Sequence, residues 1–337
     1  MRYSLSAKLR AATMFAAIAL FSAQASQAAD TLLIYNGQHK VTAEGAAKAF
    51  EKATGIKVEL RNGSSSQLAN LISEEGSKSP ADLFYSEETP PLAALAEKGL
   101  LAPIDAKTLA SLPGNYHAKD GDWVAISARV RVVAYNKAKV KPADLEPSVL
   151  NYASQKWAGK VGFVPTSGAF QEQIVAIIKL KGRDAALEWL KGLKKYGKIY
   201  NKNGAALKGV ERGEVEVALI NNYYWFALAK EKGAKNMASA LNYVGHKDAG
   251  ALITSSGIGI LKSSKNQALA QKFVAFLASP EGQQVIVNDV AEYPLNPNVK
   301  SPFDLKPFSE LDPPDVSAAD LGDAHEATEL IREAGLS

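Results

Sequence analysis

The fold is decided by residues 31–60, which read TLLIYNGQHKVTAEGAAKAFEKATGIKVEL. Residues 31–35 have the β-rich composition of a strand, and residues 57–60 form a second such run. Between them, small and apolar side chains recur at helical spacing over residues 41–54, with Phe50 the largest of them. A strand, a helix and a second strand in this order predict a βαβ unit with parallel strands.

The alternation of strands and helices continues along the chain. It extends to a helix at 65–75, a strand at 82–85 and a helix at 91–98, and this βαβαβα order predicts a parallel sheet with helices on both faces. The middle of the chain repeats the pattern, so we expect a second α/β lobe. Its expected strands lie at 130–135, 161–164, 197–200 and 215–220, and its expected helices at 170–181, 185–195, 205–212 and 224–232.

Two mostly apolar stretches, residues 124–135 and 251–261, are candidates for crossings between the lobes. Two crossings would form a hinge and leave a cleft. Ligands of open parallel sheets bind beyond the carboxyl ends of the strands, so the residues that follow each strand are the first to inspect. Helices expected at 266–277, 282–288 and 323–334 complete the chain.

The N-terminus has the features of a secretory signal peptide. Arg2, Lys8 and Arg10 precede an apolar run that is too short for a membrane span, and small residues follow it. We expect cleavage after Ala28, with Ala29 as the alternative site, so that residues 1–28 are the signal peptide and the mature protein is an exported, soluble protein.

Composition excludes several classes of function. The chain of 337 residues contains no cysteine, which excludes disulfides, iron–sulfur clusters and thiolate zinc sites. The formal charge is +4, but three of the 39 cations lie in the signal peptide, which leaves 36 against 35 carboxylates. A mature chain of about +1 has no basic field, so we expect no nucleic-acid partner.

Motifs of the common enzymes are absent from the sequence. The helix near His325 has Glu329 where a zinc protease has its second histidine. Gly257 and Gly259 lack the third glycine of a dinucleotide-binding loop, and neither a phosphate loop nor a Gly-x-Ser-x-Gly elbow is present. We therefore expect a binding protein and not an enzyme, with a periplasmic metallohydrolase as a rival interpretation.

Potential metal ligands follow three of the expected strands. His39 follows the first strand, Glu87 and Glu88 follow the third, and Tyr223 and Tyr224 follow the strand at 215–220, in the other lobe. Carboxylate, phenolate and imidazole together suit a hard, highly charged ion such as Fe³⁺. Taken singly, each has a plainer interpretation: packing aromatics, a loop histidine, or an acidic helix start.

An anion site is expected where Ser167, Gly168 and Ala169 open a helix, because the free N–H groups and the positive helix end attract anions. Fe³⁺ with one carboxylate and two phenolates is neutral, which leaves room for an anion. Arg129 and Arg131 share one face of a strand-like run and are candidates for contacting it, or else for a structural ion pair.

At these residues the chain resembles the bacterial periplasmic ferric-ion-binding proteins, the solute-binding components of iron(III) ABC transporters. The resemblance covers nearly the whole mature chain. Five motifs carry it, of which Asn-Asn-Tyr-Tyr-Trp is the most specific: they lie at 36–40, 84–87, 166–170, 221–225 and 279–283.

This resemblance implies a two-lobed α/β type II periplasmic-binding-protein fold with a hinge and an interlobe cleft, like one lobe of transferrin. The expected lobes are residues 29–128 with 254–304, and 129–253 with 305–337. The implied ferric ligands are His39, Glu87, Tyr223 and Tyr224. The residues implied around a synergistic anion, phosphate or carbonate, are Ser167, Gly168, Ala169, Asn203 and Asn221.

The chain departs from the family pattern at Glu88, where members with this ligand set have a glutamine that donates to the anion. A second carboxylate would repel phosphate unless it is protonated, paired or turned away. The resemblance also implies a periplasmic monomer that delivers iron to an inner-membrane ABC permease and its ATPase. The alternative is a binding protein of the same fold for an organic or oxyanion ligand, with the tyrosines stacking on it.

Overall fold

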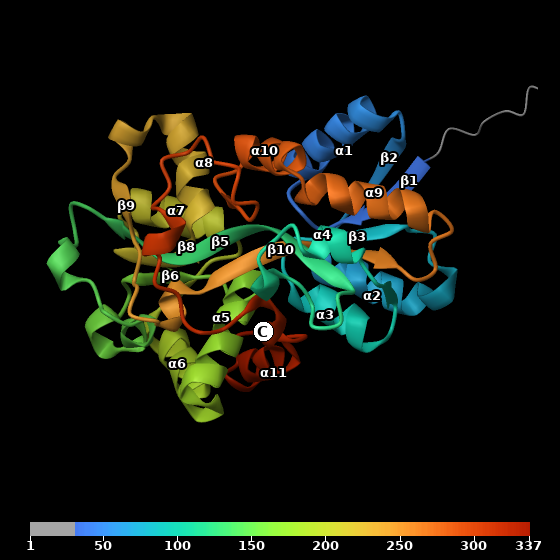
Figure 1. Ribbon diagram of the computed structural model, residues 1–337. Helices are drawn as coiled ribbons and strands as arrows, with labels where there is room; N and C mark the ends of the chain where they lie inside the picture. The colour runs from blue at the N-terminus through green and yellow to red at the C-terminus, as the bar shows by residue number, and fades with distance from the viewer. Residues whose placement is uncertain (1–30) are drawn as a thin grey trace, which may run out of the picture.

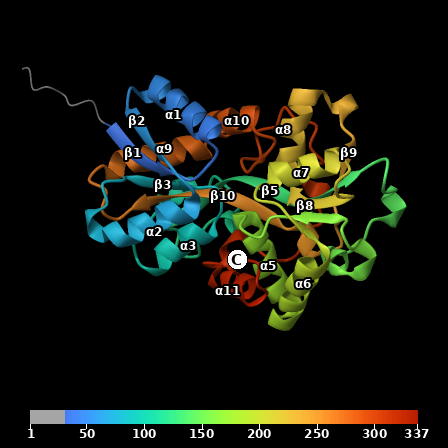
Figure 2. The same ribbon diagram turned by 180° about the vertical axis from the view of Figure 1, so that it is seen from behind.

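Two β-sheets joined by one long strand form the frame of the molecule, as a computed structural model of the chain shows (Figure 1). The structure describes residues 31–337, so the expected signal peptide at residues 1–28 lies outside the described residues. Figure 1 and the view from behind in Figure 2 show two α/β lobes side by side, with β5 and β10 passing between them. No helix within the described range is both long and apolar enough to cross a membrane.

The first lobe is built on a sheet with the strand order β2-β1-β3-β10-β5. Strands β1, β2 and β3 are parallel, but β10 runs antiparallel to both β3 and β5. The parallel pairing expected of the βαβαβα order is therefore confirmed for β1, β2 and β3, whereas β10, from the second expected crossing, makes the sheet a mixed one. The strands are β1 (Thr31–Asn36), β2 (Lys57–Asn62), β3 (Leu83–Ser86), β4 (Leu101–Ala102), β5 (Trp123–Asn136), β10 (Ile253–Leu261) and β11 (Tyr293–Pro294).

The second lobe is built on a sheet with the order β5-β8-β6-β7, and β9 also pairs with β5. Strands β6, β7 and β8 are parallel, whereas β8 is antiparallel to β5. These strands are β6 (Val161–Phe163), β7 (Lys198–Ile199), β8 (Val217–Asn221) and β9 (Ser239–Asn242).

Strand β5 belongs to both sheets. Its first part, up to Val130, pairs with β10, and from Arg131 onward it pairs with β8 and β9. The expected crossing at 124–135 is thus confirmed. The second expected crossing, 251–261, is mostly β10, which pairs only with strands of the first sheet. The chain therefore enters the first sheet at Ile253, the first residue of β10.

Helices cover the faces of both sheets, and each buries an apolar stripe. In α1, for example, Ala43, Ala46 and Phe50 are buried, and Gly55 ends the helix with a left-handed φ of 77°. The first lobe has α1 (Lys40–Thr54), α2 (Ser65–Glu75), α3 (Pro90–Glu97), α4 (Ala106–Leu109), α9 (Gln267–Ala278) and α10 (Pro280–Asp289). The second has α5 (Gly168–Lys181), α6 (Arg183–Tyr196), α7 (Asn203–Glu211) and α8 (Asn222–Lys232).

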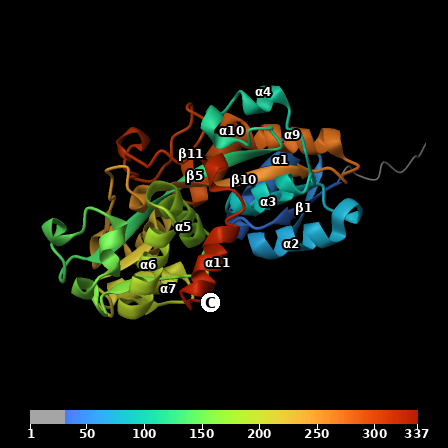
Figure 3. The same ribbon diagram turned by 90° about the horizontal axis from the view of Figure 1, so that it is seen from below.

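The C-terminal helix α11 (His325–Glu333) returns to the second lobe and packs on α5 and α6, as Figure 3 shows from below. Buried side chains of α5, α6 and α11 share one core with Val161 and Phe163 of β6. A larger core covers the first sheet and continues across β5. This placement agrees with the expected lobe division, whose residue boundaries stay a prediction.

Candidate metal site

The first lobe presents His39 at the end of β1. Asn36 shapes the turn, because its side chain donates to the carbonyl of Gln38 at 3.0 Å and accepts from the N–H of Gln38 at 3.1 Å. His39 is then the N-cap residue of α1. Its Nε2 atom is buried and has no hydrogen-bond partner among the described residues, which is an unusual state for a polar atom.

Glu87 follows β3 on the same edge of the sheet. Its backbone is held on both sides: the N–H donates to Ser65 Oγ at 3.0 Å, and the carbonyl accepts from Arg129 Nη2. The side chain points across the gap between the lobes, where its Oε1 accepts a hydrogen bond from the Tyr223 hydroxyl.

The second lobe presents Tyr223 and Tyr224 in the first turn of α8, directly after β8. Asn221 is the N-cap residue of this helix. The two phenol rings lie 4.3 Å apart, and Tyr223 is almost fully buried whereas Tyr224 is partly exposed to the cleft.

These groups converge across the interlobe gap. Glu87 Oε1 lies 3.0 Å from Tyr223 Oη and 3.7 Å from His39 Nε2, and the rings of His39 and Tyr223 are 5.1 Å apart. Two oxygens that bind one octahedral ion at 2.0–2.1 Å stand about 2.9 Å apart. In the structure the Tyr223 hydroxyl donates a hydrogen bond to Glu87 Oε1, and the same separation would suit a shared ion in place of the proton. Tyr224 lies against Tyr223, and both line one cavity with His39.

Both phenols are protonated near neutral pH. Burial, followed by the negative charge of Glu87, raises the pKa of Tyr223 well above 10 and raises the pKa of Tyr224 as well. A highly charged cation can displace these protons, because it inverts the local preference for the neutral phenol. Among residues 31–337 no three His, Asp or Glu side chains cluster as a metal site, so a metal at this position needs the phenols.

The cleft beside the tyrosines has a volume of about 980 Å³ and a polar lining. Ser167 and Gly168 at the start of α5 line it, and within residues 31–337 no hydrogen bond engages the N–H groups of Gly168 and Ala169. Asn203 Nδ2 joins this region to the tyrosine pair, donating to Ser167 Oγ at 3.0 Å and to Tyr224 Oη at 3.3 Å. The arrangement suits an anion beside the tyrosines.

The other residues expected around the anion lie farther back. Ala169 is buried within α5, and Asn221 Oδ1 accepts from Arg131 Nη1 at 3.0 Å. Arg129 and Arg131 are buried and are absent from the cleft lining. Arg129 Nη2 and both Nη atoms of Arg131 donate to protein acceptors behind the cleft. Arg129 Nε and Nη1 and Arg131 Nε have no hydrogen-bond partner within residues 31–337. Contact of either arginine with an anion stays a prediction.

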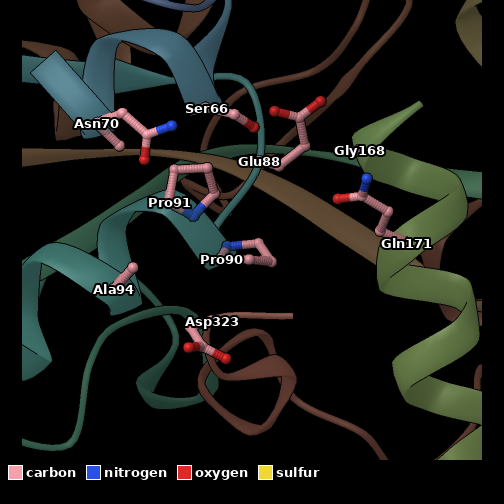
Figure 4. Close-up of a pocket in the computed structure, with 10 residues that line it drawn as sticks. Ser66, Asn70, Glu88, Pro90, Pro91, Ala94, Gly168, Gln171 and Asp323 are labelled. Atoms are coloured by element: carbon pink, nitrogen blue, oxygen red, sulfur yellow. The ribbon is translucent and has the colours of Figure 1, made fainter. Parts of the chain in front are cut away.

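Glu88 reaches from the first lobe to the helix start in the second. A Cβ atom added to Gly168 would meet Glu88 Oε1 at 2.5 Å, so the carboxyl occupies space that only glycine leaves free. Figure 4 shows Glu88 between α5, with Gly168 and Gln171, and the helices α2 and α3 on the other side of a pocket of about 130 Å³. Burial, followed by the charge of Glu87, raises the pKa of Glu88 to about 8.

Glu88→Gln is expected to stabilise the iron-free protein at alkaline pH and to have little effect in acid. The folded protein keeps a proton on Glu88 until about pH 8, whereas the ordinary pKa is 4.5, so the wild type loses stability as the pH rises through this window. Glutamine keeps the shape of the neutral acid. In urea titrations the advantage of the variant should grow by about 1–3 kcal/mol between about pH 5 and pH 9.

The control for this prediction is the same substitution at the exposed Glu97 of α3. If the difference in the free energy of unfolding between Glu88→Gln and wild type does not change with pH, Glu88 is not protonated in the folded protein near neutral pH.

Two further features of the site were missed by sequence reasoning. Lys202, directly before α7, and Lys208, within α7, line the cleft and add positive charge to its wall. Ser65, at the start of α2, holds the N–H of Glu87. Lys202 directly precedes the expected Asn203 and was within reach of the sequence, whereas the Ser65 contact joins residues 22 positions apart and has no local signal.

Comparisons with known proteins agree with this geometry. Residues 36–284 match the family model described as bacterial extracellular solute-binding protein. The chain is 52% identical over 330 residues to the major ferric iron-binding protein of Neisseria meningitidis serogroup A, covering 97% of this chain and 100% of that protein. The chain belongs to the bacterial extracellular solute-binding proteins, in the ferric-ion-binding group.

Other members of the group are similar over comparable lengths. The Fe(3+)-binding periplasmic protein of Serratia marcescens is 38% identical over 94% of each chain. The crystal structure of iron-bound HitA from Pseudomonas aeruginosa aligns with a TM-score of 0.88 and 52% identity, over 91% of this chain and 99% of that one. A Trichodesmium protein solved with iron and citrate ligands aligns with a TM-score of 0.80 and 29% identity, covering 91% of this chain and 100% of its own.

These matches confirm the two-lobed periplasmic-binding-protein fold and the family resemblance that the motifs indicated.

Proposed function

We propose that this chain captures ferric ion between its lobes in the periplasm and delivers it to an inner-membrane ABC permease for iron uptake. The proposed ligands are His39, Glu87, Tyr223 and Tyr224. The observation that carries the proposal is the contact between Glu87 of the first lobe and Tyr223 of the second, with the unpartnered Nε2 of His39 beside it.

Capture follows from ligands being divided between the lobes. An ion that bonds to both lobes stabilises the closed arrangement by its differential affinity. Moving a two-state equilibrium from 1:99 to 99:1 requires about 5.5 kcal/mol, and coordination of a multiply charged metal by several side chains supplies more than this. The closed form would then be the one that a permease and its ATPase recognise, as in other solute-binding proteins of this kind, and the carrier would act as a monomer.

An anion at the start of α5 completes the proposed site. Fe³⁺ with the Glu87 carboxylate and two phenolates is neutral, so an added phosphate or carbonate meets no excess negative charge from the ligands themselves. Gly168 N–H, Ser167 and the amide of Asn203 face its expected position. Lys202 and Lys208 in the same wall favour an anion further.

Colour provides the test. Phenolate bound to Fe³⁺ absorbs visible light, so adding ferric ion with phosphate to the metal-free protein should produce a coloured complex with one ion per chain, and gallium should displace the colour. A protein that remains colourless after ferric loading would exclude the proposal and favour an organic or oxyanion ligand stacked on the tyrosines. Metal-dependent hydrolysis of phosphate esters would instead support the rival metallohydrolase.

A further inference from the structure

Four ionisable side chains are buried behind the metal site, where β5 passes from one sheet to the other. Arg129, Arg131, Glu172 and Glu292 are each at most 1% exposed. Buried charges are strongly unfavourable unless they are paired and hydrogen-bonded, so this cluster requires an explanation. None of the four lines the cleft beside the tyrosines.

Arg129 bonds to the part of the proposed metal site that the first lobe contributes. Its Nη2 donates to the carbonyl of Glu87, the residue that supplies the carboxylate. Its Nη1 lies 4.0 Å from Glu292, whose other oxygen accepts from Ser127 on the same strand. The guanidinium therefore links β5 to the backbone of a metal ligand and is balanced by a buried carboxylate.

Arg131 bonds to the part of the proposed metal site that the second lobe contributes. Its Nη1 donates to Asn221 Oδ1 at 3.0 Å, and its Nη2 donates to Gln173 Oε1 and to the carbonyl of Leu219, both at 3.1 Å. Asn221 is the N-cap residue of the helix whose first turn carries Tyr223 and Tyr224, and its side-chain oxygen bonds to Arg131 rather than to the helix.

The residue between the two arginines makes a third bond of the same kind. The N–H of Val130 donates to Asn222 Oδ1 at 3.1 Å, and Asn222 is the first residue of α8. Three successive residues of β5 thus hold the Glu87 segment on one side and the start of the tyrosine helix on the other. They lie where the strand changes partners from β10 to β8.

We propose that Arg129 and Arg131 are paired positioning residues, each of which holds one half of the metal site to the strand that joins the lobes. This inference rests on the proposed ferric-binding function. Neither arginine touches the ion. Arg129 holds the Glu87 segment through the Glu87 carbonyl, and Arg131 holds the tyrosine helix through Asn221. The expected ligands of the two lobes therefore have one fixed arrangement when the lobes are closed. Outer-shell contacts of this kind typically change metal affinity 10–100-fold.

Lysine substitutions separate positioning from charge. Arg129→Lys and Arg131→Lys keep the positive charge but lose the fixed set of donors of the guanidinium. We expect each variant to bind ferric ion about 10–100-fold more weakly in competition with a chelator. Arg131→Lys should also shift the visible phenolate band, because the tyrosine helix moves, whereas Arg129→Lys should leave the band in place. Arg212→Lys, which alters a surface ion pair with Glu214, is the matched control and should match wild type.

A double variant tests whether a loss of affinity comes from destabilisation of the fold. Arg129→Met with Glu292→Met removes both buried charges together and should keep the thermal midpoint of the iron-free protein near that of wild type, while the loss of ferric affinity persists. Wild-type affinity in the lysine variants, or in this paired variant, would overturn the inference, and so would a weaker affinity explained wholly by unfolding of the iron-free protein. Absence of any ferric band in the wild type would instead overturn the proposed function.

Discussion

Replacing Tyr223 with phenylalanine is expected to weaken ferric binding by about 10²–10³-fold. Binding of a multiply charged metal by about four side chains releases on the order of 10–16 kcal/mol, so one of four ligands accounts for about 3–4 kcal/mol. The change removes only the hydroxyl oxygen that lies 3.0 Å from Glu87 Oε1, and the ring still fills its buried position. Ferric titration against a competing chelator, read at the visible phenolate band, measures the loss.

Tyr224→Phe should have an effect of similar size and should also reduce the intensity of the band, since one phenolate remains. Tyr200→Phe is the matched control, because Tyr200 lies in the same lobe with its hydroxyl 3.1 Å from Glu214 and does not line the cleft. If both Tyr223→Phe and Tyr224→Phe keep the ferric affinity and the colour of the wild type, neither phenol is a ligand of the ion.

Acid is expected to weaken ferric binding by about 100-fold for each unit of pH below neutral. The pKa values of Tyr223 and Tyr224 both lie above their ordinary value of 10.0, so both phenols carry protons throughout the neutral range. Binding must release both protons, and each released proton changes the affinity tenfold per pH unit. The sign follows directly: low pH keeps the phenols protonated and opposes the ion, and rising pH favours it.

The number of released protons provides an internal control for this prediction. Tyr224→Phe retains one phenol, so the logarithm of its affinity should change by about one per pH unit where that of wild type changes by about two. Affinities must be corrected for protonation of the competing chelator. Equal slopes in the two proteins, or no dependence on pH, would show that phenol deprotonation is not coupled to binding.

Local patterns predicted most of the fold. Period and composition placed α2 at residues 65–75, as observed, and the long apolar stretch at 124–135 indicated the strand that joins the lobes. The elements that were not predicted are short: β4 and β11 have two residues each, and α4 and β9 have four. Elements of this length are defined by pairing and packing with distant segments, so no local period marks them.

The direction of the strands was harder to predict than their positions. A βαβ order predicts parallel neighbours, and this holds for β1, β2 and β3. It fails at β10, which enters the first sheet antiparallel to β3 and β5 after the chain has built the second lobe. The sequence shows that 251–261 is apolar and extended, but not which strands it will lie between.

In the candidate site, too, some features could be predicted from the sequence and others could not. His39, Glu87 and Tyr223 could be listed because each follows a strand, and the structure brings them together. The roles of the two arginines could not be read in this way. Their spacing on one face of a strand indicated a pair, but only the folded chain shows that one reaches the Glu87 carbonyl and the other reaches Asn221.

The most direct test of the account is the position of the ion in crystals of the ferric-loaded protein, located by anomalous scattering at the iron absorption edge. We predict one ion per chain within about 2–2.3 Å of donor atoms from His39, Glu87, Tyr223 and Tyr224, as for other first-row metals bound by nitrogen and oxygen. An ion bound by groups of a single lobe, or one that leaves both phenol oxygens uncoordinated, would contradict capture between the lobes.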